Sequence, residues 1–178
     1  LIDVIQERML KDKKLPAPEH YIVKGDAFLI KNDGGNAVTA YEAAIAQDPR
    51  NVKAKVKIGT VYLRGKNYKE TQARYKEALD LDSNYAPGHR RYGEYLIIGG
   101  QYKNASRYFR KYIEKAEEGG LVDALIPMIQ RIIDKDPYSA EAWYVLGSGY
   151  MAQGDHEQAL KAGVREHGAT VHFVTEAL

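Results

Sequence analysis

The chain has 178 residues and a mass of 20.0 kDa, which allows one compact domain or one short repeat array. Its 26 Lys and Arg nearly balance 24 Asp and Glu, and a net charge of +2 does not favour binding to nucleic acid or membranes through bulk charge. The absence of cysteine excludes disulfides and cysteine-ligated zinc, and no apolar run approaches the ~18 residues of a membrane-spanning helix.

The first segment, residues 1–17, has Ile2, Ile5 and Met9 at roughly helical spacing, with Pro16 behind them. This spacing predicts the second helix of a truncated preceding repeat. Because the sequence begins at Leu1 and not at a methionine, we expect a fragment of a longer chain. The compartment is left open between cytoplasm and periplasm, since a chain without cysteine suits both.

Three contiguous blocks of 34 residues follow, at 18–51, 52–85 and 86–119. In these blocks the eighth place is Gly25, Gly59 and Gly93; the twentieth is Ala37, Thr71 and Ala105; the twenty-fourth is Tyr41, Tyr75 and Phe109. Each block contains two amphipathic stretches separated by a Gly- or Asn-containing turn, which predicts a pair of antiparallel helices. Small residues at places 8 and 20 allow the two helices to approach closely, and stacking of the pairs supplies the core.

The 34-residue period is interrupted after the third block. Residues 120–139 read as the second helix of a repeat that lacks its first helix, with Pro127 tolerable only near the helix start. Three explanations stay open: an inserted helix, a true deletion, or a chain gap where residues are missing from the sequence. A fourth block fits residues 140–173, with Trp143, Gly147 and Ala159 at places 4, 8 and 20, and residues 174–178 form a tail.

These matches at fixed places of a 34-residue period resemble the tetratricopeptide repeat (TPR) family. The resemblance implies an all-α fold, a right-handed superhelical array (α-solenoid) of antiparallel helix pairs. It also implies a concave groove lined by the first helix of each pair, at places 2, 5, 6, 9, 12 and 13. A groove of this kind holds an extended peptide or a helical segment of a partner.

Carried onto this chain, these places predict a basic groove opposed by few acids. Its candidate residues are Lys53, Lys57, Arg64, Arg90 and Arg91, together with Tyr144 in the last block. Arginine binds carboxylates through two hydrogen bonds, so the groove would suit an acidic peptide or a terminal carboxylate. In the family's co-chaperones, which clamp the carboxyl terminus of heat-shock proteins, the clamp matches this chain only at Arg91, and Asp26 would repel a carboxylate. Membership of that group is not expected.

Catalytic patterns are weak. The string Gly147-Ser148-Gly149 followed by Ala152 fits a dinucleotide-binding pattern, but it lies within the best helical repeat, where Gly147 is a packing residue. Histidines occur nowhere at the spacing of a helical ligand pair. We therefore expect neither an enzyme, nor a cofactor, nor a metal site.

The sequence thus predicts a non-enzymatic scaffold that binds another protein through a peptide or helical segment. Two alternatives remain: self-association into a homo-oligomer through exposed apolar helix faces, and a repeat region of a longer regulatory or enzymatic chain. Nucleic-acid binding ranks last, because the groove lacks an aromatic stacking platform.

Overall fold

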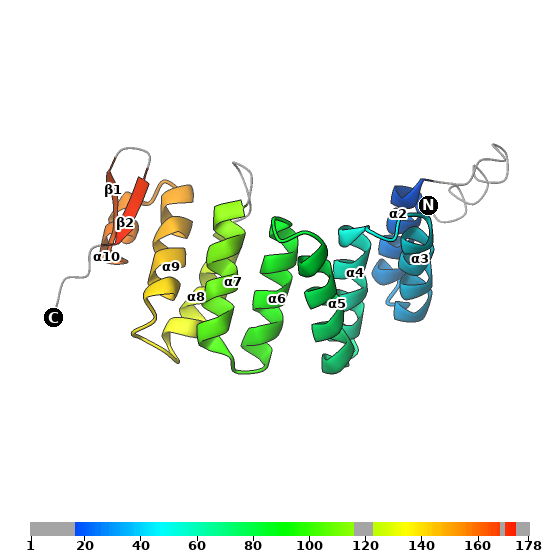
Figure 1. The fold of residues 1–178 in the computed structure, drawn as a ribbon. Helices are drawn as coiled ribbons and strands as arrows, with labels where there is room; N and C mark the ends of the chain where they lie inside the picture. The colour runs from blue at the N-terminus through cyan, green and yellow to red at the C-terminus, as the bar shows by residue number, and fades with distance from the viewer. Residues whose placement is uncertain (1–16, 116–122, 168–169, 174–178) are drawn as a thin grey trace. The chain divides into compact units, whose positions relative to one another are not determined.

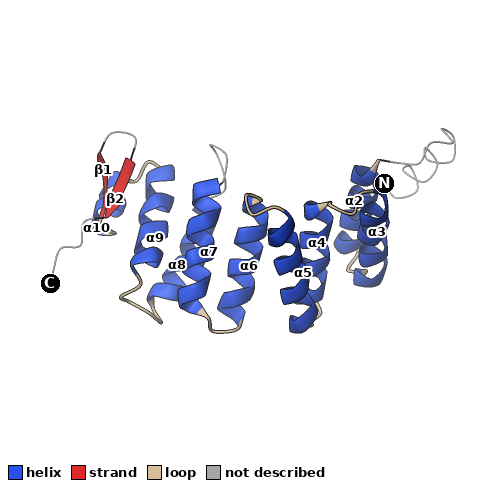
Figure 2. Cartoon of the chain, in the orientation of Figure 1, coloured by secondary structure: helices blue, strands red, loops and turns tan. Residues whose placement is uncertain are grey.

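A computed structural model describes residues 17–115, 123–167 and 170–173 (Figures 1 and 2). The chain divides into two compact units, Leu1–Gly88 and His89–Leu178. In both units the described chain is built mainly from helices of 13 or 14 residues joined by short turns, so the predicted all-α class is confirmed. The truncated helix predicted at 1–17 lies outside the described residues, apart from its last position.

The first unit contains two antiparallel helix pairs. Its helices are α2 (Pro18–Ile30), α3 (Gly34–Gln47), α4 (Val52–Arg64) and α5 (Tyr68–Leu81). Helices α2 and α3 coincide with the first predicted block, and α4 and α5 with the second. We call the first helix of each pair helix A and the second helix B. A shared core formed by Ile22, Tyr41 and Ile58 joins the two pairs.

Each helix pair turns at the same place. Residue 15 of all four blocks has a positive φ: Asn32 (58°), Lys66 (58°), Gly100 (70°) and Gly154 (75°). In the first, second and fourth blocks a polar side chain (Asp33, Asn67 or Asp155) then caps the next helix; the Asn67 side chain, for example, accepts a hydrogen bond from the backbone N–H of Glu70. A left-handed residue followed by a cap ends one helix and begins the next within three residues.

The repeated glycine at place 8 lies against the aromatic ring at place 24 of its own block. A Cβ on Gly59 would lie 2.6 Å from the Tyr75 ring, and one on Gly93 would lie 2.8 Å from the Phe109 ring. Gly25 faces Tyr41 in the same way. The predicted close approach of the two helices is therefore produced by a ring that occupies the space of the missing side chain.

The second unit contains the remaining elements. They are α6 (Ala86–Ile98, of which residues 89–98 belong to this unit), α7 (Tyr102–Lys115), the 3-10 turn η1 (Asp123–Leu125), α8 (Ile126–Ile133), α9 (Ala140–Ala152) and α10 (His156–Lys161). Helix α8 stands in the predicted 120–139 half-repeat, and Pro127 is its second residue, as expected. It packs on α9 and buries Ile129, Ile132 and Ile133.

The last block departs from a complete helix pair. Helix α10 ends at Lys161, and Gly163 follows with a φ of 76°. Strands β1 (Val164–His167) and β2 (Thr170–Phe173) then form an antiparallel sheet in which Val164 pairs with Phe173. The expected second helix of 140–173 is therefore short, because a left-handed glycine ends it and the chain continues as a hairpin.

Candidate functional site

In the first two repeats, place 9 of helix A is the position where a helix-B side chain reaches the predicted binding face. The Tyr41 hydroxyl of α3 donates a hydrogen bond of 2.6 Å to Asp26 of α2, 15 residues earlier. The Tyr75 hydroxyl of α5 lies 3.1 Å from the hydroxyl of Thr60 on α4, again 15 residues earlier. Both rings are fully buried between the two helices of their pair, and the hydroxyl of each tyrosine reaches the side chain at place 9.

Asp26 also binds Lys57 of the next helix A. The Lys57 Nζ lies 2.7 Å from Oδ1 and 2.9 Å from Oδ2 of Asp26, and 6.0 Å from the centroid of the Tyr41 ring. Lys57 is therefore neutralised within the first unit, and its ion pair links α2 to α4. The expectation that few acids oppose the basic residues does not hold at this position.

The Tyr41 phenol is held in its protonated form. Burial raises its pKa, and the hydrogen bond to the Asp26 carboxylate raises it further, while the charge of Arg64 acts in the opposite direction. Asp26 thus accepts hydrogen bonds from a neutral phenol and an ammonium group. This leaves a fixed polar network on the side of the unit formed by α2 and α4.

Lys53 and Arg64 differ from Lys57. Both are exposed and belong to α4, near its two ends. Within residues 17–88, neither forms an ion pair with an acid. Of the predicted groove cations in the first unit, Lys53 and Arg64 are therefore the two whose charge no acid in the described part of the unit neutralises.

In the second unit, Arg90 and Arg91 share one carboxylate. Arg90 Nε donates to Glu94 Oε1 at 3.1 Å, and Arg91 Nη1 donates to Glu94 Oε2 at 2.8 Å. Glu94 stands at place 9 of the third block, where place 24 is Phe109 and has no hydroxyl. Two arginines therefore bind the place-9 acid in a repeat whose place-24 ring has no hydroxyl.

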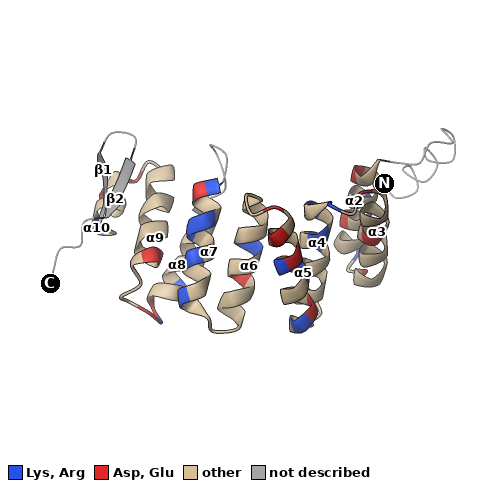
Figure 3. Ribbon diagram, in the orientation of Figure 1, with Lys and Arg blue, Asp and Glu red and all other residues tan. Residues whose placement is uncertain are grey.

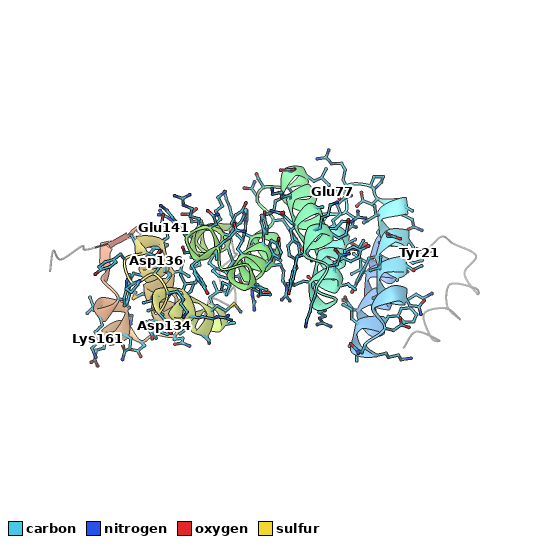
Figure 4. The ribbon with its side chains drawn as sticks, turned by 90° about the horizontal axis from the view of Figure 1, so that it is seen from below. Tyr21, Glu77, Asp134, Asp136, Glu141 and Lys161 are labelled. Atoms are coloured by element: carbon cyan, nitrogen blue, oxygen red, sulfur yellow. The ribbon has the colours of Figure 1, made fainter. Side chains whose placement is uncertain are left out.

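Tyr144 at place 5 of the last block faces helix α7. The guanidinium carbon of Arg110 lies 5.0 Å from the centroid of the Tyr144 ring, and Arg107 Nε lies 3.8 Å from Glu141 Oε1 (Glu141 is labelled in Figure 4). The predicted groove side of α9 therefore contacts helix B of the third block. The structure brings Tyr144 together with cations that the sequence analysis does not select.

A buried lysine that pairs with an exposed glutamate is a further feature that the sequence did not indicate. Lys55 occupies place 4, where the last block has Trp143, and its side chain is 6% exposed. Its Nζ lies 2.7 Å from Glu77 Oε1 on α5 (Glu77 is labelled in Figure 4). The hydrogen bond from Lys55 lowers the pKa of Glu77. A lysine at a place of bulky packing residues is the signal that could have revealed this pair.

Among the described residues, no group of three or more His, Asp or Glu side chains is arranged to hold a metal ion. None of the helices in these ranges has the length and apolar character needed to cross a membrane.

The helix pairs, the repeated glycine–ring contact and the repeated turn define a helical-repeat protein of the α-solenoid class. The model of the tetratricopeptide repeat family matches residues 22–86 and 126–166, more than half of the chain. The chain belongs to the tetratricopeptide repeat family.

Known proteins agree with this assignment. A stretch of 67 residues is 30% identical to tetratricopeptide repeat protein 21B of Mus musculus; it covers 38% of this chain and 5% of that protein, so the chain spans a small part of this relative. YrrB, described as a TPR protein with an unusual peptide-binding site, has a TM-score of 0.55 at 21% identity, over 91% of this chain and 90% of that chain. The first TPR of Spaghetti (RPAP3), bound to the HSP90 peptide SRMEEVD, has a TM-score of 0.60 at 16% identity, over 66% and 94%.

Proposed function

We propose that the protein is an interaction scaffold that binds a peptide or helical segment of a partner on the helix-A face of the first unit. This face is formed by Asp26, Lys53, Lys57, Thr60 and Arg64. The observation that carries the proposal is the contrast between the paired Lys57 and the two exposed cations at the ends of α4, Lys53 and Arg64. Two structural relatives support it: YrrB with its unusual peptide-binding site, and the first TPR of Spaghetti bound to an HSP90 peptide.

The chemistry of the face favours a segment with acidic groups at its ends and polar groups between them. Lys53 and Arg64 are eleven residues apart, and at 1.5 Å per helical residue they lie about 16 Å from each other along α4. About five extended residues span this distance. The Lys57–Asp26 pair between them offers both a donor and an acceptor, so a single long run of acids would meet the Asp26 carboxylate.

Arg90, Arg91 and Tyr144 have a lesser part in this proposal. Glu94 holds both arginines, and Arg110 covers Tyr144, so binding through these groups would first require that their present contacts break. We therefore propose Lys53 and Arg64 as the residues whose charge contributes to partner binding.

A site-specific photo-crosslinking experiment tests the proposal. The crosslinking amino acid benzoylphenylalanine replaces Val23, an exposed residue at place 6 of α2, in one variant and the exposed Lys69 of α5 in the other, so that Lys53 and Arg64 stay intact. In native lysate, one discrete partner adduct at position 23 and none at position 69 supports the proposal. Arg64→Glu in the position-23 variant should reduce that adduct at least fivefold.

Two results would contradict the proposal. Equal adducts at the two positions, or none at either, would show that this face does not select a partner. An adduct with the mass of two copies of the chain would instead support the self-association alternative.

A further inference from the structure

The unit His89–Leu178 contains a second charged surface, which lies on a helix B and is independent of the proposed helix-A face. Helix α7 carries five basic residues against one acid, Glu114, a net charge of +4 in a chain whose net charge is +2. The basic residues are Lys103, Arg107, Arg110, Lys111 and Lys115. The rest of the chain is therefore net acidic, and Figure 3 shows the basic residues gathered on α7.

The basic residues share one side of the helix. Lys103, Arg107, Arg110 and Lys111 follow one another at intervals of four, three and one residues, which keeps them within about a quarter of the helix circumference. All four are exposed. The buried residues of α7, among them Phe109, point to the other side. The helix thus presents a basic stripe to solvent.

Two of these cations lie over aromatic rings. Arg110 lies over the Tyr144 ring at 5.0 Å, and Lys111 Nζ lies 5.4 Å from the centroid of the Tyr108 ring. A cation held over a ring loses less side-chain freedom when it binds an anion, because part of that freedom is already lost. Glu114 accepts from Arg110 at 2.8 Å, and Glu141 of α9 lies 3.8 Å from Arg107, so acids pair with two of the five cations.

We propose that this α7 stripe, Lys103 to Lys111, binds an acidic segment of a partner protein. The stripe extends over eight residues, about 12 Å of helix, which matches about four residues of extended chain. Carboxylates at this density complement the net charge of the helix, above all at Lys103 and Lys111, to which the described residues give no acid partner. The partner class is therefore a protein with a short run of Asp or Glu.

The same contacts disfavour other anionic partners. Single-stranded nucleic acid binds through bases stacked on open aromatic faces. Here, cations of the protein itself already lie over Tyr144 and Tyr108. Insertion into a membrane needs exposed apolar side chains beside the cations, and α7 has none among the large exposed hydrophobic residues of the described chain.

Fluorescence anisotropy with a labelled peptide of six glutamates tests this proposal, with a six-glutamine peptide as the neutral probe. The test variant is Lys103→Glu with Lys111→Glu. The control is Lys69→Glu with Lys76→Glu, two exposed lysines of α5, which makes the same change in net charge. At low salt we expect the wild-type chain to bind the glutamate peptide and not the glutamine peptide. The test variant should bind the glutamate peptide at least tenfold more weakly, and the affinity of the control variant should stay within twofold of wild type.

Three results would overturn the proposal: no binding to the wild-type chain, an equal loss in both variants, or tighter stripe-dependent binding of hexauridylate or of anionic vesicles. If circular dichroism shows that the Glu variant loses helix, the variant Lys103→Gln with Lys111→Gln replaces it in the test. We expect this variant to bind the glutamate peptide about threefold more weakly than the wild-type chain. An unchanged affinity would refute the proposal. Arg64→Glu should leave peptide binding unchanged, so this surface and the helix-A face can fail separately.

Discussion

The contact between place 8 and place 24 predicts that Gly59→Ala destabilises the first unit. The added Cβ would lie 2.6 Å from Cε1 and 2.7 Å from Cδ1 of Tyr75, whereas ordinary carbon contacts begin near about 3.5 Å. The fully buried ring would have to retreat by about 0.9 Å. Overpacking of this kind costs about 1–3 kcal/mol, and the better helix propensity of alanine returns at most about 1 kcal/mol. We expect a net loss of about 1–2 kcal/mol.

Urea unfolding followed by circular dichroism measures this loss. With a denaturant slope of about 2 kcal/mol per molar, the midpoint should fall by about 0.5–1 M. Gly65→Ala is the matched control in the same helix pair, because its new Cβ would meet nothing closer than 3.6 Å, and we expect a change within about 0.5 kcal/mol.

A double-mutant cycle identifies the ring as the cause. Tyr75→Leu removes the ring that the new methyl group meets, so it should cost about 1 kcal/mol less in the Gly59→Ala background than in the wild-type chain. A Gly59→Ala variant as stable as the wild type, or a cycle with additive effects, would refute the packing argument.

The remaining predictions concern stability, each read from urea midpoints. Lys66→Gly should stabilise by about 1 kcal/mol, since Lys66 has a φ of 58°, whereas Gly154→Ala should lose about as much at its φ of 75°. Glu77→Gln should cost about 1–2 kcal/mol because the buried Lys55 loses its counter-ion, a value reduced by the 44% exposure of Glu77. The pKa of Glu77 is lowered from its ordinary value of 4.5, so the carboxylate stabilises the fold above pH 4.5, and this stabilisation is lost as the pH falls through the pKa of the folded state. The difference in stability between Glu77→Gln and wild type should therefore disappear toward pH 3. The pKa of Tyr41 is raised by burial, so the folded chain keeps a proton that the unfolded chain releases above pH 10; Tyr41→Phe should lose stability less steeply than wild type between pH 10 and pH 11.

The periodic parts of the fold were predictable because each structural need returns at a fixed place. Gly59 and Tyr75 stand in the same relation as Gly93 and Phe109, so glycine repeated at place 8 and an aromatic ring repeated at place 24 indicate a close contact from the sequence alone. Helix ends were predictable for the same reason, since Asn or Gly recurs at the turn.

The charges of the candidate site were less predictable, because ion pairs depend on side-chain directions that spacing alone does not give. Lys57 reaches Asp26 across 31 residues, and two arginines converge on Glu94. Lys55 is not among the residues selected from the sequence, because place 4 is not one of the groove places. The hairpin after Gly163 also lacks the 34-residue pattern, and no repeated place constrains it.

The residue at place 9 of a repeat shows how the paired groove cations are neutralised. Where place 24 is tyrosine, its hydroxyl reaches place 9, as Tyr41 reaches Asp26; where place 24 is Phe109, the acid at place 9, Glu94, binds arginines of its own helix. In the first and third repeats, the acid at place 9 is thus used to neutralise helix-A cations. Helix α7 has a single acid for five cations, so the net positive charge of a nearly neutral chain remains concentrated on a helix B. The residues that a groove pattern selects are therefore partly neutralised, and a charge-reversal scan should find its largest effect on acidic peptides at Lys103 and Lys111.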